Sequence, residues 1–268
     1  PERYFNLGIV EQHAVSLAAG MARRGLVPLL HSFSNFLARR AHDQIAVSVA
    51  WPQCNVKLIG GSCGLFDGRN GPSHQAIDDL GAMAALPGVV VMEPGDQRQT
   101  CELLGHAARI HGPVYLRLRR FGAPADLTSG ADPLKPTTLE APRDAVATLV
   151  ACGSMLELAL QAARLLADAG RPIELLHVAV LRPLDPTLLV ESALRTGAIA
   201  VVENHGTSGG FGSIIGEAIE PLGVRLLRIG LPHSFLPAGS PSWQADQADL
   251  SAEAIAYRVA TFAEGREP

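Results

Sequence analysis

Residues 27–49, VPLLHSFSNFLARRAHDQIAVSV, pass from an apolar run of strand length directly into a stretch whose apolar residues recur at helical spacing. The first run is continuous rather than alternating, which is typical of a strand buried on both faces of a sheet. A buried strand followed at once by a helix is the repeating unit of a parallel α/β sheet. This segment therefore predicts an α/β fold, with a strand at 27–33 and a helix over 35–49.

The same alternation continues on both sides of this segment. We expect strands at 4–9, 27–33, 55–61, 88–94 and 113–119, and helices over 11–24, 35–49, 75–85 and 96–110. These elements predict one doubly wound domain, because helices between successive buried strands favour parallel pairing. The run at 4–9 resembles an interior strand with no helix before it, so we expect a further segment on its N-terminal side.

Residues 121–142, FGAPADLTSGADPLKPTTLEAP, are rich in proline and show no apolar period, which is typical of a linker. The alternation then restarts, with strands expected at 145–153, 173–180, 198–204 and 224–230 and helices over 155–169, 186–195, 211–221 and 252–263. The sequence therefore predicts two doubly wound sheet domains. We place the first domain at residues 1–122, the linker at 123–142 and the second domain at 143–268.

The composition disfavours several classes of function. With 268 residues, of which 47% are hydrophobic, the chain can bury two domain cores. A net charge of -4 and a pI near 6.1 lack the basic character of a nucleic-acid-binding protein. Its apolar stretches are much shorter than the ~20 residues that span a bilayer, and no segment resembles a signal peptide. We expect a soluble cytoplasmic protein that binds neither nucleic acid nor membrane.

The four cysteines are scattered along the chain without a CxxC pair, at Cys54, Cys63, Cys101 and Cys152. Zinc sites and disulfide frameworks have more regular spacing. We expect reduced cysteines that are mostly buried and behave as small hydrophobic residues.

Two polar residues stand where predicted strands pass into helices. Glu11 follows the apolar run LGIV and opens an alanine-rich helix, where a carboxylate also suits simple capping, because the first helical turn is the positive end of the helix dipole. His74 lies near the end of the glycine-rich loop GGSCGLFDGRNGPSHQ, residues 60–75. Such a loop lets the backbone approach a ligand at the carboxyl end of a strand. His74 by itself suits a cap, the core or a ligand site, and the loop favours the ligand site.

Aromatic and basic side chains gather at two other strand ends. Phe33 and Phe36 are three residues apart where strand 27–33 turns into a helix, and they suit either the core or a wall against a flat heteroaromatic ligand. On strand 113–119, alternation would put Arg117 and Arg119 on one face and Arg120 on the other. These arginines are either a solvated strand end or a clamp for phosphate or carboxylate.

A second glycine-rich stretch, ENHGTSGGFGS at residues 203–213, leads from a predicted strand into a helix. The spacing of its glycines matches neither phosphate-loop template. Tight packing between strand and helix is therefore favoured over a ligand site.

Several longer motifs occur in order along the chain: YFNLGIVEQHAVSLAAGMA, SFSNFLARRAHDQI, GLFDGRNGPSHQAIDDL, VVVMEPGD and GPVYLRLRR. Together they resemble the pyrimidine-binding domain of the transketolase family. The second half, with LRPLD, VVENHGTSGGFGS and RIGLPHSFLPAGS, is similar to the C-terminal domain of that family. EQHAVSLAAG and LPHSFLPAGS lean toward deoxyxylulose phosphate synthase, whereas GPSHQAI and YLRLRR lean toward transketolases split into two chains.

The resemblance implies thiamine diphosphate as cofactor, with Glu11 as the catalytic carboxylate that meets N1′ of its aminopyrimidine. A carboxyl group in an apolar pocket has a raised pKa, so it can share a proton with that nitrogen and favour the imino tautomer that activates the thiazolium C2. Phe33 and Phe36 match the aromatic wall of the family's pyrimidine site. Arg39 is a further cofactor-binding residue by the same resemblance.

The substrate site implied by the resemblance has two departures from the family pattern. His74 matches a catalytic histidine that contacts the oxygens of the substrate, and Arg120 matches an arginine that binds a sugar phosphate. Asn70 stands where the family has a carboxylate that grips a substrate hydroxyl, and Ser62 stands at the position of a second histidine. The two replacements put the standard pentose phosphate substrates in doubt.

The family's domain for the diphosphate and its metal, with a GDG-to-Asn motif, has no counterpart in the sequence. The resemblance therefore implies a partner, an N-terminal transketolase subunit that binds Mg2+ or Ca2+ through the diphosphate. No metal ligand is expected from this chain. We expect a symmetric assembly with at least two copies of each chain, an α2β2 heterotetramer.

The function favoured by these features is that of the C-terminal subunit of a two-component transketolase-like transferase. It would move a two-carbon ketol or acyl unit from a ketose phosphate or 2-oxo acid donor to an aldehyde. The alternatives are a deoxyxylulose phosphate synthase-like subunit, the β subunit of a 2-oxo acid dehydrogenase, and a non-catalytic pairing module. Glu11 disfavours the last of these, because such a module has no need of a carboxylate at this turn.

Overall fold

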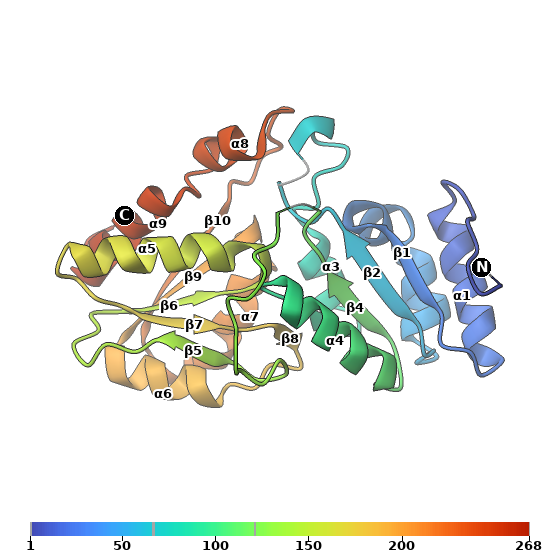
Figure 1. The fold of residues 1–268 in the computed structure, drawn as a ribbon, viewed down its shortest axis with the longest axis horizontal. Coiled ribbons are helices and arrows are strands. Elements are labelled where there is room, and N and C mark those ends of the chain that lie inside the picture. The colour runs from blue at the N-terminus through green and yellow to red at the C-terminus, as the bar shows by residue number, and fades with distance from the viewer. Residues whose placement is uncertain (1, 66–67, 121, 268) are drawn as a thin grey trace.

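A computed structural model of the protein describes residues 2–65, 68–120 and 122–267. Each half of the elongated molecule is built on a five-stranded sheet with helices packed against it (Figure 1). The predicted α/β fold with two sheet domains is confirmed. Phe66 and Asp67 of the glycine-rich loop, and Phe121 at the start of the proline-rich segment, lie outside the described residues.

The first sheet has the strand order β1-β2-β4-β3-β8. Its parallel strands are β1 (Leu29–Phe33), β2 (Lys57–Gly61), β4 (Val114–Arg117) and β3 (Val90–Met92), and β8 (Val180–Arg182) pairs antiparallel with β3. Its helical elements are α1 (Glu11–Arg23), η1 (Phe36–Arg40), α2 (His42–Gln44), η2 (Ile45–Ala50), η3 (Gly68–Asn70), α3 (Asp79–Ala84) and α4 (Gln97–Arg109). Burial along β2 and β4 explains why their residues other than Lys57 and Arg117, at the two ends, are apolar or aromatic, since both faces are covered.

The second sheet has the strand order β10-β9-β6-β7-β5. Its strands are β6 (Thr148–Ala151), β7 (Glu174–His177), β9 (Ala198–Gly206) and β10 (Arg225–Leu231) in parallel, with β5 (Thr137–Glu140) antiparallel at the edge. Its helical elements are η4 (Gly153–Met155), α5 (Leu156–Asp168), α6 (Thr187–Thr196), α7 (Phe211–Ile219), η5 (Glu220–Leu222), α8 (Pro241–Gln247) and α9 (Ala252–Ala263).

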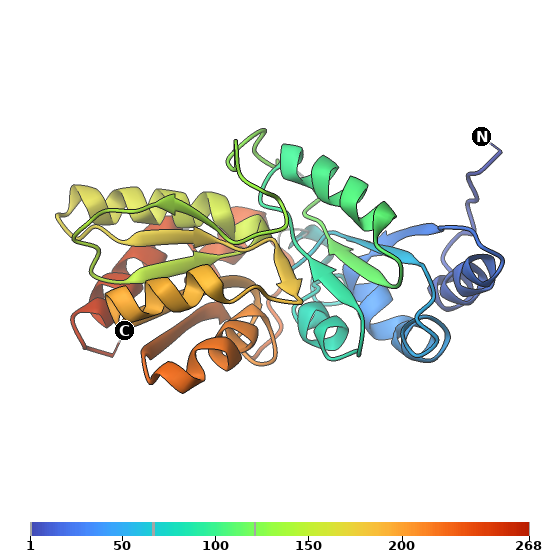
Figure 2. The same ribbon diagram turned by 90° about the horizontal axis from the view of Figure 1, so that it is seen from below.

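One of the hydrophobic core clusters extends across both halves. A single buried cluster joins Leu58 and Val91 of the first sheet to Val150 and Val201 of the second. Strand β8 reinforces this union, because it follows β7 of the second sheet and then pairs with β3 of the first. The halves therefore pack as one body, as the two views of the ribbon show (Figure 1, Figure 2).

The structure corrects three of the predicted elements. Residues 4–9 form no strand: they extend from α1 with Tyr4 and Ile9 exposed, because within the described residues no strand lies beside them (Figure 2). Predicted strand 173–180 is divided into β7 and the start of β8, which belong to different sheets. The predicted linker 123–142 contains the edge strand β5. In addition, helix α8 had no counterpart among the predicted elements.

The helical segment predicted at 35–49 is present, but much of it has wide π turns. In η1 and η2 the backbone N–H groups of Ala41 and Trp51 donate to the carbonyl groups five residues earlier, at 3.1 and 2.9 Å. Such turns occur frequently at functional sites. Here they set the orientation of Phe36, Arg39 and Arg40. Among the described residues, no helix is long and apolar enough to cross a membrane.

Candidate active site

A pocket of about 590 Å³ opens at the carboxyl ends of β1 and β2, beside the start of α1. Ligands bind at this end of the strands in open α/β sheets. Six of the eight residues predicted from the sequence to form a site line it: Glu11, Phe33, Phe36, Ser62, His74 and Arg120. His31 and Arg119 also line the pocket and were missed as site residues, although Arg119 had been considered for an anion clamp.

Glu11 opens α1 and is almost completely buried in this pocket. Its Oε2 accepts a hydrogen bond from Nη1 of Arg40 at 2.8 Å, and its Oε1 accepts one from the Ser32 hydroxyl at 3.2 Å. Burial by itself raises the pKa of Glu11. The opposing effects are larger: a hydrogen bond from its own backbone N–H, the hydrogen bond and charge of Arg40, and the hydrogen bond from Ser32. The pKa of Glu11 therefore lies below its ordinary value. The expected raised pKa is therefore wrong for this structure, because Arg40 was not foreseen as the partner of Glu11.

Three rings form one wall of the pocket. The ring centres of Phe33 and Phe36 are 5.5 Å apart, and the His74 ring lies 5.4 Å from Phe33 and 5.0 Å from Phe36. All three side chains are only partly buried, and all three line the pocket. This arrangement favours the wall for a flat ligand over the alternative of a core position. The Nδ1 atom of His74 is hydrogen-bonded to the Ser73 hydroxyl at 2.9 Å, which fixes the ring.

Ser62 follows directly after β2, and its backbone has a φ of 58°. A non-glycine residue in this left-handed region is strained, and such strain is found at functional sites. The side chain is nevertheless buried and faces the pocket.

The arginines after β4 do not follow the expected alternation. Arg119 and Arg120 both line the pocket, and the Arg120 guanidinium lies 5.7 Å from the ring centre of Phe33. Arg117 is fully buried elsewhere, because β4 ends at Arg117 and the strand alternation ends with it. A basic rim formed by Arg119 and Arg120 suits a phosphate or carboxylate group.

Two predicted site residues lie outside the lining of the pocket. Arg39 forms an ion pair with Asp78, from Nε to Oδ2 at 2.9 Å, and its guanidinium lies 5.5 Å from the ring centre of Phe235. Asn70 ends η3 and is exposed. Their roles toward cofactor and substrate remain predictions that rest on the sequence resemblance.

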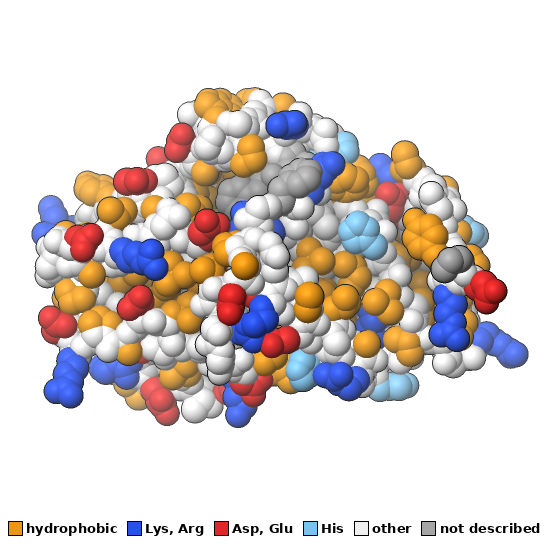
Figure 3. All heavy atoms as spheres, in the orientation of Figure 1, with side chains coloured by type: hydrophobic (Ala, Val, Ile, Leu, Met, Phe, Trp, Pro, Cys, Tyr) orange, Lys and Arg blue, Asp and Glu red, His pale blue; other side chains and the backbone are white. Residues whose placement is uncertain are grey.

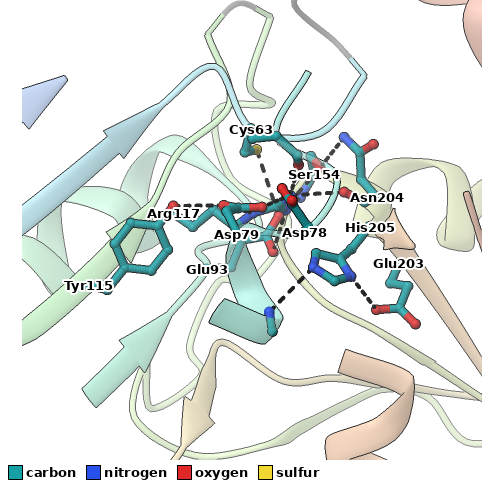
Figure 4. Close-up of polar contacts among 12 residues, drawn as sticks. Cys63, Asp78, Asp79, Glu93, Tyr115, Arg117, Ser154, Glu203, Asn204 and His205 are labelled. Atoms are coloured by element: carbon teal, nitrogen blue, oxygen red, sulfur yellow. Dashed lines mark hydrogen bonds and ion pairs between the residues drawn. The ribbon is translucent and has the colours of Figure 1, made fainter. Parts of the chain in front are cut away.

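A buried network behind the pocket was missed in the sequence. Arg117 donates to Asp79 from Nε at 2.8 Å and to Glu93 from Nη1 at 3.0 Å, and its Nη2 donates to the carbonyl oxygen of Asn204 at 2.9 Å (Figure 4). Tyr115 donates to Asp79 at 2.7 Å. The charge of Arg117 lowers the pKa of Asp79, although burial opposes this. The signal in the sequence was a charged residue at the end of two buried strands, Arg117 at the end of β4 and Glu93 directly after β3.

The glycine-rich stretch of the second half packs tightly, as favoured from its sequence. A Cβ atom on Gly210 would lie 2.2 Å from Oε2 of Glu203 and 2.3 Å from Nδ1 of His205. Only glycine allows this approach of α7 to β9.

Comparison with known proteins assigns both halves. Residues 1–124 match the transketolase pyrimidine binding domain, and residues 139–255 match the transketolase C-terminal domain. The chain belongs to the transketolase family. It corresponds to the C-terminal section of a split transketolase and is related to deoxyxylulose phosphate synthase.

Three similar proteins illustrate this relationship. The 6-deoxy-6-sulfo-D-fructose transketolase subunit SqwH of Clostridium sp. (strain MSTE9) is 34% identical, over 95% of this chain and 80% of its own. The 1-deoxy-D-xylulose-5-phosphate synthase 1 of Geobacter sulfurreducens is 36% identical, over 98% of this chain but 41% of its own. A solved structure described as a split gene transketolase, inactive beta4 tetramer, has a TM-score of 0.89 and 36% identity, over 97% of this chain and 84% of its own. The chain thus spans most of the split proteins but about two fifths of the synthase.

Transketolase-family proteins use thiamine diphosphate, and the pocket suits one part of it. A buried carboxylate beside an aromatic wall fits a flat aminopyrimidine ring that carries hydrogen-bonding nitrogens. The diphosphate and its metal need other ligands. Within residues 2–65, 68–120 and 122–267, no group of three or more His, Cys, Asp or Glu side chains is placed to hold a metal ion.

Proposed function

We propose that this transketolase-family chain is the C-terminal subunit of a two-component thiamine diphosphate-dependent enzyme. The enzyme would transfer a two-carbon ketol or acyl unit from a ketose phosphate or 2-oxo acid donor to an aldehyde. The observation that carries the proposal is the position of Glu11, buried in one pocket with Phe36, His74 and Arg120. The pocket thereby combines a carboxylate, an aromatic wall and a basic rim.

The proposal gives roles to the six predicted residues that line the pocket and to Arg39 and Asn70, which lie outside its lining. Thiamine diphosphate, when bound, supplies the electron sink needed to break and form the carbon–carbon bond. Glu11 holds a proton at N1′ of the pyrimidine, Phe36 and Phe33 orient that ring, and Arg39 contacts the cofactor at its edge. The burial of Glu11 in the pocket keeps water from its carboxylate, which favours proton sharing.

The substrate would lie between His74 and the basic rim. His74 hydrogen-bonds to the oxygens of the donor, with Ser62 and Asn70 contacting its hydroxyl groups. Arg120, with Arg119 beside it, binds a terminal phosphate or carboxylate bidentately. Either anion satisfies this rim, so the donor can be a sugar phosphate or a smaller oxo acid.

The rest of the cofactor site would come from an N-terminal partner subunit that binds Mg2+ through the diphosphate. Support comes from the name of SqwH as a transketolase subunit and from the split gene transketolase neighbour. The exposed apolar side chains around α1 and η2 suit burial by such a partner. We propose two copies of each chain in the complex.

A synthase-like activity is the second candidate. It is favoured by the 36% identity to a 1-deoxy-D-xylulose-5-phosphate synthase over nearly the whole of this chain. In that case the donor would be a 2-oxo acid, which loses carbon dioxide before the acyl unit reaches the aldehyde.

The test is the exchange Glu11→Gln in this chain, assayed with its N-terminal partner, thiamine diphosphate and Mg2+. We expect transfer from ketose phosphates to fall about 10²- to 10⁴-fold, the range for loss of a proton-transfer group. The control is Glu191→Gln, an exposed glutamate on α6, which should leave the rate unchanged.

Three results would change the proposal. Full activity in the Glu11→Gln complex would remove Glu11 from the chemistry. Turnover of pyruvate but of no ketose would favour the synthase-like candidate. Tight binding of thiamine diphosphate by this chain without a partner would overturn the divided site.

A further inference from the structure

Arg40 contacts both the carboxylate and the aromatic wall of the proposed pyrimidine site. Its Nη1 donates to Oε2 of Glu11 at 2.8 Å, and its Cζ lies 4.3 Å from the ring centre of Phe36. The first contact is a charge-assisted hydrogen bond and the second is a cation–π contact. One flat group therefore holds together the two side chains proposed to bind the flat ring of the cofactor.

The contacts of Arg40 are of the kind that an aminopyrimidine would make. The rings of Phe33 and His74 meet the Phe36 ring at 65° and 68°, so they touch it edge-on and do not stack on it. The guanidinium group is planar and delocalised, lies over that ring and donates N–H to the carboxylate. An aminopyrimidine is also planar, stacks on aromatic rings and hydrogen-bonds to a carboxylate.

We propose that Arg40 is an internal stand-in for the aminopyrimidine, which holds Glu11 and Phe36 until the cofactor displaces it. The inference rests on the proposed function, because it assumes that this pocket receives the cofactor ring. Arg40 would be a gating residue, which acts through Glu11 and takes no part in the chemistry itself.

The surroundings of Arg40 allow this displacement. Its side chain is 44% exposed and stands at the end of a short π-helical turn, so a rotation of the side chain reaches solvent. The Ser32 hydroxyl would keep its hydrogen bond to Oε1 and hold Glu11 in place. Once its cation has left, the buried carboxylate is less stabilised as an anion and can share a proton with the incoming ring.

The expected size of the effect follows from the contacts that must open. The cofactor can bind only to molecules in which Arg40 has left the pocket. The apparent affinity is therefore the affinity of that open form multiplied by the fraction of molecules that are open. A partly exposed ion pair and a partly exposed cation–π contact are each worth a few-fold, and together about 3- to 30-fold. Removing Arg40 should therefore tighten cofactor binding by that factor.

The experiment measures the dissociation constant of thiamine diphosphate by calorimetry, in the complex with the N-terminal partner and Mg2+. We expect tighter binding and faster association for Arg40→Ala and for Arg40→Met, which keeps more of the side-chain volume and serves if the alanine variant folds poorly. The control is Arg171→Ala, which removes an ion pair with Glu264 in the second half. Its dissociation constant should equal that of the parent complex.

Each outcome decides the question. Weaker binding of thiamine diphosphate in both Arg40 variants would show that Arg40 helps to hold the cofactor. Unchanged binding would show that the ion pair between Arg40 and Glu11 does not compete with the cofactor. Either result overturns the proposal that Arg40 takes the place of the aminopyrimidine, and leaves the proposed function intact. If the parent complex and every variant fail to bind thiamine diphosphate, the proposed function fails, and this inference fails with it.

Discussion

Glu203 is a buried carboxyl group at the junction of the two halves, on β9. Its Oε1 accepts a hydrogen bond from the backbone N–H of Gly212 at 3.1 Å, whereas its Oε2 has no hydrogen-bond partner among the described residues. That Oε2 lies 3.8 Å from Nδ1 of His205 (Figure 4). His205 is held neutral, since its Nε2 accepts from the Gly81 N–H at 3.3 Å and its Nδ1 lies 2.7 Å from the Gly206 carbonyl oxygen. Burial therefore raises the pKa of Glu203 to about 7.

We predict that Glu203 makes the protein less stable as the pH rises. The folded pKa of about 7 lies above the ordinary value of 4.5, so the folded state binds the extra proton between these values. The stabilisation is full below pH 4.5 and is lost as the pH rises through about 7, a change on the order of 3 kcal/mol. Urea unfolding from pH 5 to 8.5 measures this loss as a decrease in the free energy of unfolding of the parent chain relative to that of the Glu203→Gln variant.

The comparison with Glu203→Gln is needed because buried histidines act in the opposite direction. Burial lowers the pKa of His205, and that of His177 to about 4, so both add stability as the pH rises. Both histidines are present in both proteins, so their contributions largely cancel, and the difference in free energy of unfolding reports mainly on Glu203. A difference that stays constant from pH 5 to 8.5 would contradict the prediction.

At the residue scale, local sequence predicted which side chains meet in the pocket but not how they pair. Glu11 starts α1, Phe33 ends β1, and His74 lies in the loop between β2 and α3. Such strand ends and the loops after them converge at one edge of a parallel sheet. The pairing of Glu11 with Arg40 depends on the π turn of η1, which shifts the side chains relative to an ordinary helix. No local pattern distinguishes Arg40 from Arg39.

At the scale of elements, the strands that were wrongly predicted from the sequence are those whose neighbours in the sheet are distant in sequence. Residues 173–180 form one mainly apolar run, yet the buried residues Val178 and Ala179 carry the chain from β7 in one sheet to β8 in the other. Strand β5 has the polar sequence of a solvated edge, so it was assigned to the linker. Buried strands and helices of the βα units were predictable, because their apolar period is set by local contacts.

Lys57 shows how one side chain joins two such elements. It begins β2, is fully buried, and its Nζ donates to the carbonyl oxygens of Ile110 and Gly112 at 2.7 Å each. These carbonyl groups lie just after the end of α4, where a positive charge is favoured by the helix dipole. Lys57 therefore fixes the end of α4 against the first sheet.

We predict that Lys57→Met lowers the free energy of unfolding by about 2–3 kcal/mol, because two buried carbonyl groups lose their donor while the side-chain volume is kept. Denaturant unfolding measures the loss, and hydrogen exchange should increase first at the end of α4. Lys135→Met is the matched control, since Lys135 is exposed. Equal stabilities for the two variants would show that the carbonyl groups find other donors.

At the scale of the whole molecule, the two halves form one rigid support for the pocket. Arg117 connects α3, the end of β3 and β9 through Asp79, Glu93 and Asn204. Removing one partner from such a buried network leaves an uncompensated charge. The pocket borders this network, so the position of the loop that carries His74 depends on the second half.

The half of the molecule that holds the pocket also presents an apolar surface, around α1 and η2. Trp51 is 82% exposed and Ile9 83% exposed, and Val47 of η2 is also exposed. A groove of about 440 Å³ between α1 and η2 is lined by small residues such as Ala19 and Gly20 together with Trp51. Figure 3 shows hydrophobic side chains beside basic ones at this right-hand end of the molecule, where Figure 1 places the N-terminus and α1. Large exposed apolar patches mark interfaces with other proteins.

We predict that Trp51→Ser weakens binding of the proposed N-terminal partner at least tenfold, because an exposed aromatic side chain beside a groove is a typical anchor of an interface. The melting temperature of the isolated chain should hardly change, since Trp51 contributes little to its core. Sedimentation velocity with the partner measures the affinity, and in the parent protein the fluorescence of Trp51 should shift to shorter wavelength on complex formation. Tyr257→Ser is the control, because Tyr257 is 69% exposed on α9, in the second half of the chain. If both variants bind the partner as well as the parent chain does, the interface lies elsewhere. If only the Tyr257 variant loses affinity, the partner binds to the second half of the chain, and it could not complete the proposed cofactor site across α1.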